Sequence, residues 1–391
     1  MPSDLKKGRK LEQNSKKNTI NVDSICRIIN DHITILPGRY NDSQDIVRGC
    51  VAMAACKGSI SGYQKYHEGL PSRTTCLNIL HELDMDEMIR EASAMLIQAS
   101  KNVIRRGSIQ SVAIDLTQDP YYGLRDKAPD SYIVGGKTKK STNYFYTYLT
   151  MSIVDQGRHI TIFSIPWRKG MEAINAIQMC IELIDHMGLK IRSLCLDRGF
   201  YAGEIFRYLQ AERIPHIVPV PKRGKGLKAL LNGSKSNTFG YTLNKNTNQP
   251  VDLVITDCLV YLKGKGKEKG KKAKHGIEHH AFVVFGMSTS PRYIRELYRH
   301  RFAIESTYRI RNTTLPKTTS KDPKIRYFYS LISFLIQNWW VSIKWNRFAR
   351  IQRGPKVVED ERFALAHLVE IMRNEASNWF RLKGIDEIAI T

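Results

Sequence analysis

The hydrophobic pattern of this 391-residue chain changes at Gly107, and the change separates two kinds of predicted structure. From Val22 to Arg106, apolar residues recur every three or four positions, as in Ile25–Ile33 and Met88–Val103, which predicts an all-α segment. After Gly107, short apolar runs alternate with helical segments. Such alternation is typical of an α/β domain with helices packed on a sheet.

The α/β segment begins with Ser111–Leu116, a nearly continuous apolar run of the kind found in strands buried on both faces. Two further strand-like runs, Tyr144–Val154 and His159–Ile165, are joined at Asp155–Gly157 and predict a β-hairpin. We therefore expect a mixed sheet with helices on both faces. The remaining predicted elements are a helix at Met171–Met187, a strand at Ile191–Leu196, a helix at Ala202–Arg213 and a strand at His216–Val220.

Residues 219–286 interrupt this alternation and are rich in Gly, Lys and Asn. They contain strand-like runs at Phe239–Leu243, Asp252–Leu262 and His280–Gly286, so we predict a β-rich insertion. Within it, Lys263–Lys274 holds seven Lys and one Glu, which indicates a basic hairpin loop that tracks DNA. Helical patterns return at Pro291–Thr313 and Lys324–Arg350, and a charged, partly helical tail follows.

The all-α segment contains a pattern typical of helix-turn-helix units. A short helix is followed by a Gly-Leu-Pro turn and by a second helix that opens at Ser72, so Arg73 and Thr74 are candidate DNA contacts. An ordinary bundle turn with a serine N-cap is the alternative. The predicted domains are a disordered basic arm (1–20), a helical DNA-binding domain (21–106), a catalytic domain (107–350) with its insertion at 219–286, and a helical tail (351–391).

The charge of the chain points to a polyanionic partner. Its 61 Lys and Arg against 37 Asp and Glu give a net charge of +24, and each basic residue that meets a phosphate releases a counterion. The seven cysteines form no CxxC motif, which favours buried, reduced thiols over a zinc ribbon. The N-terminus lacks the apolar stretch of a signal peptide, and Tyr329–Trp345 is too short and polar to span a membrane. We expect a cytoplasmic, nucleoid-associated protein without a membrane partner.

Two aspartates stand at the ends of predicted buried strands, where a carboxylate is costly unless it is paired, hydrogen-bonded or bound to a metal. Asp115 ends the first strand and Asp197 follows IRSLCL. Either one alone is equally well interpreted as a strand-end aspartate that caps a turn. Asp119, four residues beyond Asp115, is interpreted as part of a turn before Pro120, with a supporting role at the site as the alternative.

A third acid, Glu305, lies in a predicted helix rich in arginine. At about 100° per residue, Tyr298, Arg301 and Asn312 share a stripe with it roughly 60° wide. Taken alone, Glu305 is a salt-bridge residue among arginines. Taken with the two aspartates, it completes a set of hard oxygen donors suited to Mg²⁺ or Mn²⁺. Two such ions would clamp the attacking and leaving oxygens of an in-line phosphoryl displacement.

The order of these acids resembles DDE transposases of the insertion-sequence type, which have a ribonuclease H-like core. The matching features are the Asp of AIDLT, the DRGFY stretch and a Tyr-x2-Arg-x3-Glu signature at Tyr298, Arg301 and Glu305. Asn312 stands where the family has lysine. The chain looks most similar to the branch with a β-strand insertion before the glutamate helix, and the resemblance covers Ser111–Trp345.

The resemblance implies that Asp115, Asp197 and Glu305 bind two Mg²⁺ or Mn²⁺ ions. Metal-activated water would cut at the 3′ end of a mobile element, and the freed 3′-hydroxyl would attack target DNA, with a homodimer holding two ends of double-stranded DNA. The contact of the missing lysine is lost or moved to a nearby basic residue. The candidate DNA contacts are Tyr298, Arg301, Arg309, Arg311, Asn312, Lys317, Lys222 and Arg223, besides Arg73 and Thr74.

Two other functions are compatible with the sequence. The chain could be a catalytically silent relative that only binds DNA, or a structure-specific nuclease on the same core. Relatives that form hairpin ends stack a flipped base on tryptophan, and residues 219–285 contain none, so Phe239, Tyr241 or Tyr261 would have to substitute. His275, His279 and His280 are interpreted as a basic surface cluster rather than a zinc site.

Overall fold

The structure, a computed structural model, describes residues 20–36, 43–124, 131–155, 157–222, 225–231, 233–243, 249–262, 276–350, 357–358 and 362–384. Several sequence-based predictions lie wholly or partly outside these residues: the basic arm apart from Ile20, the DNA contact assigned to Arg223, the lysine-rich loop at 263–274, His275 of the histidine cluster, and parts of the C-terminal tail. The chain forms two compact units. The first comprises Met1–Ala99, Thr313–Trp340 and Glu359–Thr391, and the second comprises Ser100–Asn312 and Val341–Val358.

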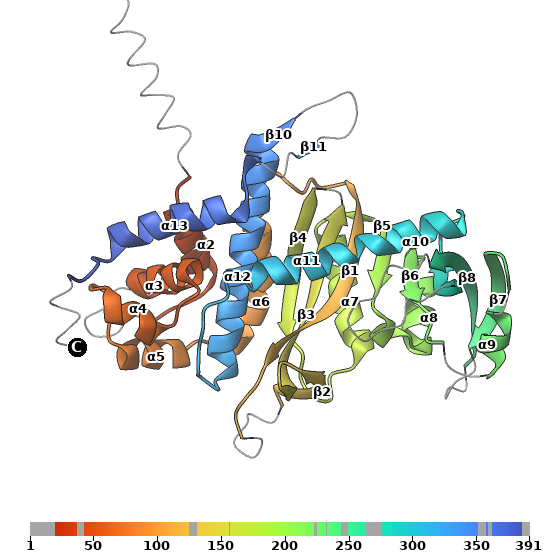
Figure 1. Cartoon of the computed structure of the whole chain (residues 1–391), viewed down its shortest axis with the longest axis horizontal. Helices are drawn as coiled ribbons and strands as arrows, with labels where there is room; N and C mark the ends of the chain where they lie inside the picture. Colours follow the sequence, from red (N-terminus) through yellow and green to blue (C-terminus); the bar gives the residue numbers. More distant parts are fainter. Residues whose placement is uncertain are drawn as a thin grey trace, which may run out of the picture. The chain divides into compact units, whose positions relative to one another are not determined.

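The first unit is built from helices, as the periodicity of the N-terminal segment predicts. Its helices are α2 (Asp23–His32), α3 (Ser43–Cys56), α4 (Ile60–Tyr66), α5 (Arg73–His81), α6 (Met85–Ala99), most of α12 (Pro323–Ile343) and α13 (Leu365–Trp379) (Figure 1). Helix α3 is buried almost all round, which makes it the centre of the bundle.

Helix α12 groups with the N-terminal helices, whereas the sequence-based boundaries placed it in the catalytic domain. Polar contacts within the first unit accompany this grouping. Asn338 donates a hydrogen bond from Nδ2 to the carbonyl oxygen of Leu96 at 3.0 Å, and Asp322, just before the helix, pairs with His81 at 2.5 Å. The buried amide explains why a polar residue interrupts the apolar stretch of this helix.

The two short helices predicted around the Gly-Leu-Pro turn are present as α4 and α5. Ser72 caps α5, because its Oγ accepts a hydrogen bond from the backbone N–H of Thr75 at 3.2 Å. Arg73 and Thr74 lie in the first turn of α5, and both are exposed.

The second unit is centred on a nine-stranded mixed sheet, in agreement with the predicted α/β class. Strand β3 lies between β1 on one side and β2 and β4 on the other, and β5 and β6 follow β1 in parallel. The strands are β1 (Ile109–Pro120), β2 (Ile133–Lys139), β3 (Thr142–Asp155), β4 (Arg158–Pro166), β5 (Lys190–Leu196), β6 (His216–Pro219), β7 (Asn237–Leu243), β8 (Val251–Leu262) and β9 (Gly276–Phe285).

The β-rich insertion continues this sheet instead of forming a separate layer. Strand β9 pairs antiparallel with β6, with His216 opposite Phe285, and β8 and β7 follow it outward. The predicted hairpin is also present, because β3 and β4 pair antiparallel with Asp155 opposite Arg158. Core and insertion therefore share one hydrogen-bonded sheet.

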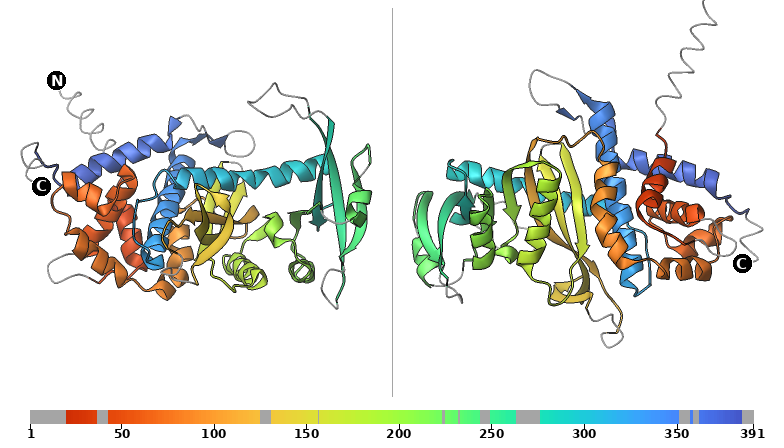
Figure 2. Two further views of the ribbon diagram at one scale, coloured as in Figure 1. Left: turned by 60° about the horizontal axis from the view of Figure 1, so that its bottom comes forward. Right: turned by 180° about the vertical axis from the view of Figure 1, so that it is seen from behind.

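Helices cover both faces of the sheet (Figure 2). Helices α7 (Ala173–His186) and α8 (Gly203–Ala211) lie on one face, and α10 (Pro291–His300) and α11 (Phe302–Arg311) lie on the other. The sequence predicted one helix over Pro291–Thr313, but it is divided at Arg301, whose φ of −56° and ψ of −33° remain helical. The shorter elements of this unit are η2 (Arg198–Phe200), α9 (Lys225–Leu230), η3 (Lys344–Phe348), β10 (Ala349–Arg350) and β11 (Val357–Val358).

The seven cysteines all lie in the described residues, where they are free thiols, and all except Cys56 are buried. None of the helices in the described residues is long and apolar enough to cross a membrane.

Candidate active site

The first two acids meet where the parallel pairing of β1 and β5 ends. The prediction that Asp115 ends its strand is wrong, because β1 continues to Pro120, whereas Asp197 directly follows β5. In the β1–β5 ladder, Ile114 lies opposite Leu196, and Asp115 and Asp197 are the next residues of each chain segment. The sequence places one at the end of an apolar run and the other just after one, and the parallel register brings them side by side. Asp115 is held in place by the backbone N–H of Leu116, which donates to its Oδ1 at 2.8 Å.

Glu305 reaches the same place from α11. This helix is attached to the sheet by Tyr308, whose hydroxyl lies 2.7 Å from Oγ1 of Thr150, in a hydrogen bond that either group can donate. Thr150 is the residue of β3 directly opposite Asp115. Because Glu305 and Tyr308 are three residues apart on one helix, the Tyr308 anchor fixes the glutamate above Asp115.

Arg301 contacts all three acids. Its Nη1 donates to Oδ2 of Asp115 at 2.7 Å, and its Nη2 lies 3.6 Å from Oδ1 of Asp197 and 3.5 Å from Oε1 of Glu305. The guanidinium also lies 5.4 Å from the ring centroid of Tyr298 and 5.5 Å from that of Phe302. Asp115 and Glu305, the first and last of the three acids, are about 190 residues apart in the sequence. All three acids thus share one buried cation.

The three acids differ in their exposure to solvent. The side chain of Asp115 is 12% exposed, whereas those of Asp197 and Glu305 are 45% and 55% exposed. Burial raises the pKa of Asp115 to about 6, although the Arg301 charge and the Leu116 N–H oppose the shift. Asp115 is therefore the fixed, desolvated member of the set, and the other two face solvent.

Asp119 and Arg311 form a second buried ion pair beside this cluster. Nη1 and Nη2 of Arg311 donate to the two carboxylate oxygens of Asp119 at 2.7 and 2.8 Å, and Arg311 is fully buried. The turn predicted at Asp119 is absent, because β1 continues through Pro120. Arg311, a predicted DNA contact, instead ties the end of α11 to β1 and presents no surface to a ligand.

The other residues of the signature helix take different positions. Asn312 caps α11 and accepts a hydrogen bond from Nη1 of Arg311 at 3.2 Å, so it lies away from the acid cluster. Arg309 is exposed and donates to Oγ of Ser306 at 3.1 Å. Tyr298 is 7% exposed and packs on Phe282, with a ring-centroid distance of 4.9 Å.

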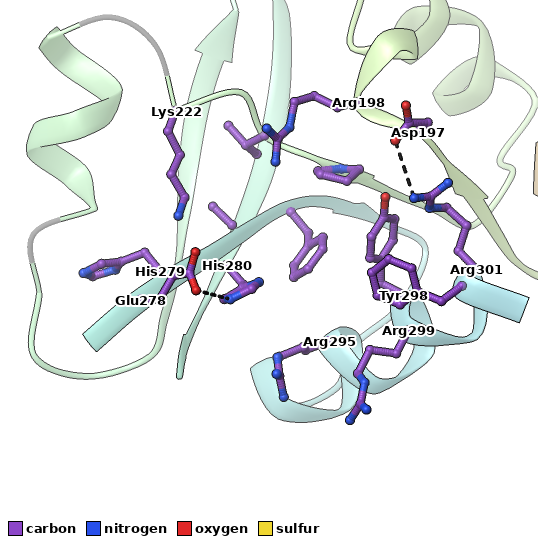
Figure 3. Close-up of a pocket in the computed structure, with 15 residues that line it drawn as sticks. Asp197, Arg198, Lys222, Glu278, His279, His280, Arg295, Tyr298, Arg299 and Arg301 are labelled. Carbon is purple, nitrogen blue, oxygen red and sulfur yellow. Dashed lines mark ion pairs between the residues drawn. The ribbon is translucent and has the colours of Figure 1, made fainter. Parts of the chain in front are cut away.

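A pocket of about 540 Å³ opens beside Asp197 and Arg301 (Figure 3). Arg295 and Arg299 enter it from α10, and Lys222 enters from the segment that follows β6. Basic side chains outnumber acidic ones in its lining, which includes Arg198, Lys222, Arg295, Arg299, Arg301, His279 and His280 against Asp197 and Glu278. The exposed ring of Phe302 also borders it. The pocket is suited to a phosphate group or a nucleotide.

Five of these pocket residues are not among the candidates predicted from sequence: Arg198, Arg295, Arg299, Phe302 and Glu278. Arg198 could have been found, since it follows Asp197 directly. Of the predicted histidine cluster, the structure describes His279 and His280, which have different partners. His279 pairs with buried Asp257 at 2.6 Å, and His280 pairs with Glu278 at 3.5 Å. Only their position on β9, next to β6, brings them to the pocket.

The chemistry of the three acids suits a divalent metal, because carboxylates are the hard oxygen donors that Mg²⁺ and Mn²⁺ prefer. Their present arrangement encloses a guanidinium. As the side chains stand, no group of three His, Cys, Asp or Glu residues in the described part of the chain could hold a metal ion.

A second pocket, of about 810 Å³, lies within the first unit. It brings together Arg73 of α5 and Lys317 of the segment before α12, two predicted DNA contacts that are 244 positions apart in the sequence. Lys321 and the hydroxyl groups of Thr318, Thr319 and Ser320 also line it. The pocket thus offers cations and hydrogen-bond donors together.

The fold is similar to that of a solved transposase. The cryo-EM structure of a piggyBac transposase synaptic complex with hairpin DNA matches with a TM-score of 0.55 and 11% sequence identity, over 90% of this chain and 75% of that one. No curated protein matches the sequence. The model of the transposase DDE domain family matches residues 108–322, which is more than half of the chain. By that match, the chain is a member of the DDE transposase family.

Proposed function

We propose that this transposase cleaves DNA at the ends of its element and joins the resulting 3′-hydroxyl to target DNA, using Asp115, Asp197 and Glu305 as ligands for two Mg²⁺ or Mn²⁺ ions. One observation carries the proposal. Three carboxylates from two strands and a helix all lie within 4 Å of the same guanidinium, beside a pocket rich in basic side chains.

The two solvent-facing acids and the buried one have separate tasks in this proposal. Asp115 is held by Leu116 and by the sheet, and therefore supplies a fixed reference point for the other two. Asp197 and Glu305 are half exposed, so they are accessible to ions and to a DNA strand. Bound divalent ions would supply the positive charge that polarises the attacked phosphate and lowers the pKa of the attacking water.

The basic pocket is the proposed binding site for the DNA strand next to the acids. Arg198, Lys222 and Arg299 would pair with backbone phosphates, which is the contact that dominates affinity for DNA. Phe302 offers an exposed ring to a base. The similar piggyBac structure is a synaptic complex with hairpin DNA, which supports DNA as the partner. By the family resemblance, two copies of the chain would hold two ends of double-stranded DNA.

The test is a nicking assay on DNA that carries the junction between the element and its flank, with Mg²⁺ present. Asp197→Asn removes one carboxylate charge with little change in shape and is expected to lower nicking by at least roughly a thousandfold. Binding to the same DNA is expected to stay within about twofold of the parent protein. Glu182→Gln, at an exposed glutamate of α7 on the opposite face of the sheet, is the matched control and should nick normally.

The assay also separates the proposal from two alternatives. Nicking by Asp197→Asn at the parent rate would contradict the assignment of the metal site. A parent protein that binds the junction but never nicks it would indicate a catalytically silent DNA-binding relative. Cutting of branched DNA without regard to the junction sequence would indicate a structure-specific nuclease.

A further inference from the structure

We infer that Arg301 is a tethered counter-cation for the three acids, which it holds together before metal binding and from which a divalent ion must displace it. The inference rests on the proposed function and deepens it, because the resemblance assigns Arg301 to DNA only. In the described residues, the ion pairs of Asp115, Asp197 and Glu305 all go to this one guanidinium.

The burial of Arg301 makes its charge indispensable in the metal-free protein. Its side chain is 8% exposed, and three carboxylates this close would repel one another without a cation between them. A surface arginine that awaits DNA would extend into solvent. Arg301 is instead confined between the Tyr298 and Phe302 rings and the acids, in the position of an internal salt-bridge partner.

The contacts of Arg301 are unequal, and this inequality gives the displacement a path. The bond from Nη1 to buried Asp115 is 2.7 Å long, whereas the Nη2 contacts to Asp197 and Glu305 are 3.6 and 3.5 Å and reach half-exposed carboxylates. Nε of Arg301 has no hydrogen-bond partner in the described part of the chain. The guanidinium can therefore release the two outer acids first and Asp115 last.

If Arg301 and the metal ion compete for the same carboxylates, loss of Arg301 should raise the affinity for metal instead of lowering it. Replacing Arg301 with an uncharged residue removes the competitor and should strengthen metal binding, whereas loss of a DNA-contacting or purely structural residue would leave metal affinity unchanged or weaker. The same replacement leaves three uncompensated carboxylates, so the metal-free protein should lose stability and regain it when metal is added.

The experiment titrates the full chain with Mn²⁺ alone and follows free Mn²⁺ by electron paramagnetic resonance, without DNA. Arg301→Gln is expected to bind Mn²⁺ roughly tenfold more tightly than the parent, and Arg301→Lys, which keeps the charge, within about threefold of it. Arg299→Gln is the matched control. It removes a charge from the same pocket, but Arg299 pairs with Glu296 rather than with the three acids, so Mn²⁺ affinity should stay close to that of the parent.

A thermal unfolding series provides the second readout. In EDTA, Arg301→Gln should melt below the parent, and Mn²⁺ should raise its melting temperature more than it raises that of the parent. Equal losses with and without Mn²⁺, together with unchanged or weaker Mn²⁺ affinity, would overturn the inference and leave Arg301 a structural residue.

Two further variants separate this inference from the proposed function. If Asp197→Asn binds Mn²⁺ as tightly as the parent, the proposed metal site is wrong. The counter-cation is still tested in EDTA by adding Asp197→Asn to Arg301→Gln, because removing one of the repelling carboxylates should recover part of the lost melting temperature. Strictly additive losses in that double variant would contradict the role of Arg301.

Discussion

Arg311 and Asp119 form a two-point ion pair that joins the last turn of α11 to the end of β1, with N–O distances of 2.7 and 2.8 Å. The pair lies four residues beyond Asp115 on the strand and six beyond Glu305 on the helix. It therefore fixes how the helix that carries one acid meets the strand that carries another. Arg311 is fully buried, so its charge depends on Asp119 for compensation.

We predict that Asp119→Asn lowers the free energy of unfolding by about 3 to 5 kcal/mol, the usual cost of leaving one member of a buried pair uncompensated. The double variant Asp119→Leu with Arg311→Met should be less destabilised than the single variant, because neither charge remains. Chemical denaturation at several denaturant concentrations measures both values. Additive destabilisation in the double variant would show that the two side chains do not act as a pair.

Tyr308→Phe removes the hydroxyl that bonds to Thr150 and is expected to cost about 1 kcal/mol of stability. Because this bond holds Glu305 above Asp115, the nicking rate should fall roughly tenfold through misplacement of the glutamate. Tyr293→Phe, at an exposed tyrosine of α10, is the control and should leave both quantities unchanged. A full nicking rate in Tyr308→Phe would mean that the anchor does not position Glu305.

His216 should make the stability of the protein depend on pH. It is stacked between Phe206 and Phe285, and burial lowers its pKa from 6.5 to about 4. Between these values the unfolded chain binds a proton that the folded chain does not, so this residue's contribution to stability falls as pH decreases from about 6.5 to about 4. The full loss is about 3 kcal/mol.

His216→Phe removes this proton-binding group, so the difference in stability between the variant and the parent should shift in favour of the variant as the pH is lowered. Unfolding free energies measured at pH 7 and at pH 4.5 test this expectation. The comparison between the two proteins matters, because Asp115, with its pKa raised to about 6, contributes with the opposite sign in the same pH range. A constant difference at both pH values would contradict the buried neutral histidine.

Arg73→Ala and Lys317→Ala are each expected to weaken binding to double-stranded DNA and to reduce the slope of log affinity against log salt concentration by about one unit. The reason is that both residues line one pocket of the first unit. Fluorescence anisotropy at four or more salt concentrations measures the slope. Arg90→Ala, at an exposed arginine of α6 outside the lining of that pocket, should change it less. Equal effects of all three substitutions would argue against a specific site.

Much of the fold could be predicted from local pattern. The apolar run around Asp115 became the centre of β1, and the two runs predicted to form a hairpin became the antiparallel pair β3 and β4, because strand burial acts over a few residues. The unit to which α12 belongs could not be predicted from local pattern. Its grouping with the N-terminal helices depends on contacts such as that of Asn338 with Leu96, more than 200 residues apart in the sequence.

The same distinction between local pattern and long-range contact applies to the candidate site. The sequence determined the residue types that any site of this protein can use: Asp115 in an apolar run, Asp197 just after another, and Glu305 four residues after Arg301 on a helical pattern. Only the tertiary structure decided that Arg301 is buried among the three acids, and that Arg311 is paired with Asp119 instead of facing DNA. An ion pair of two charges 186 or 192 residues apart leaves no trace in local periodicity, because its energy depends on distance and burial in space.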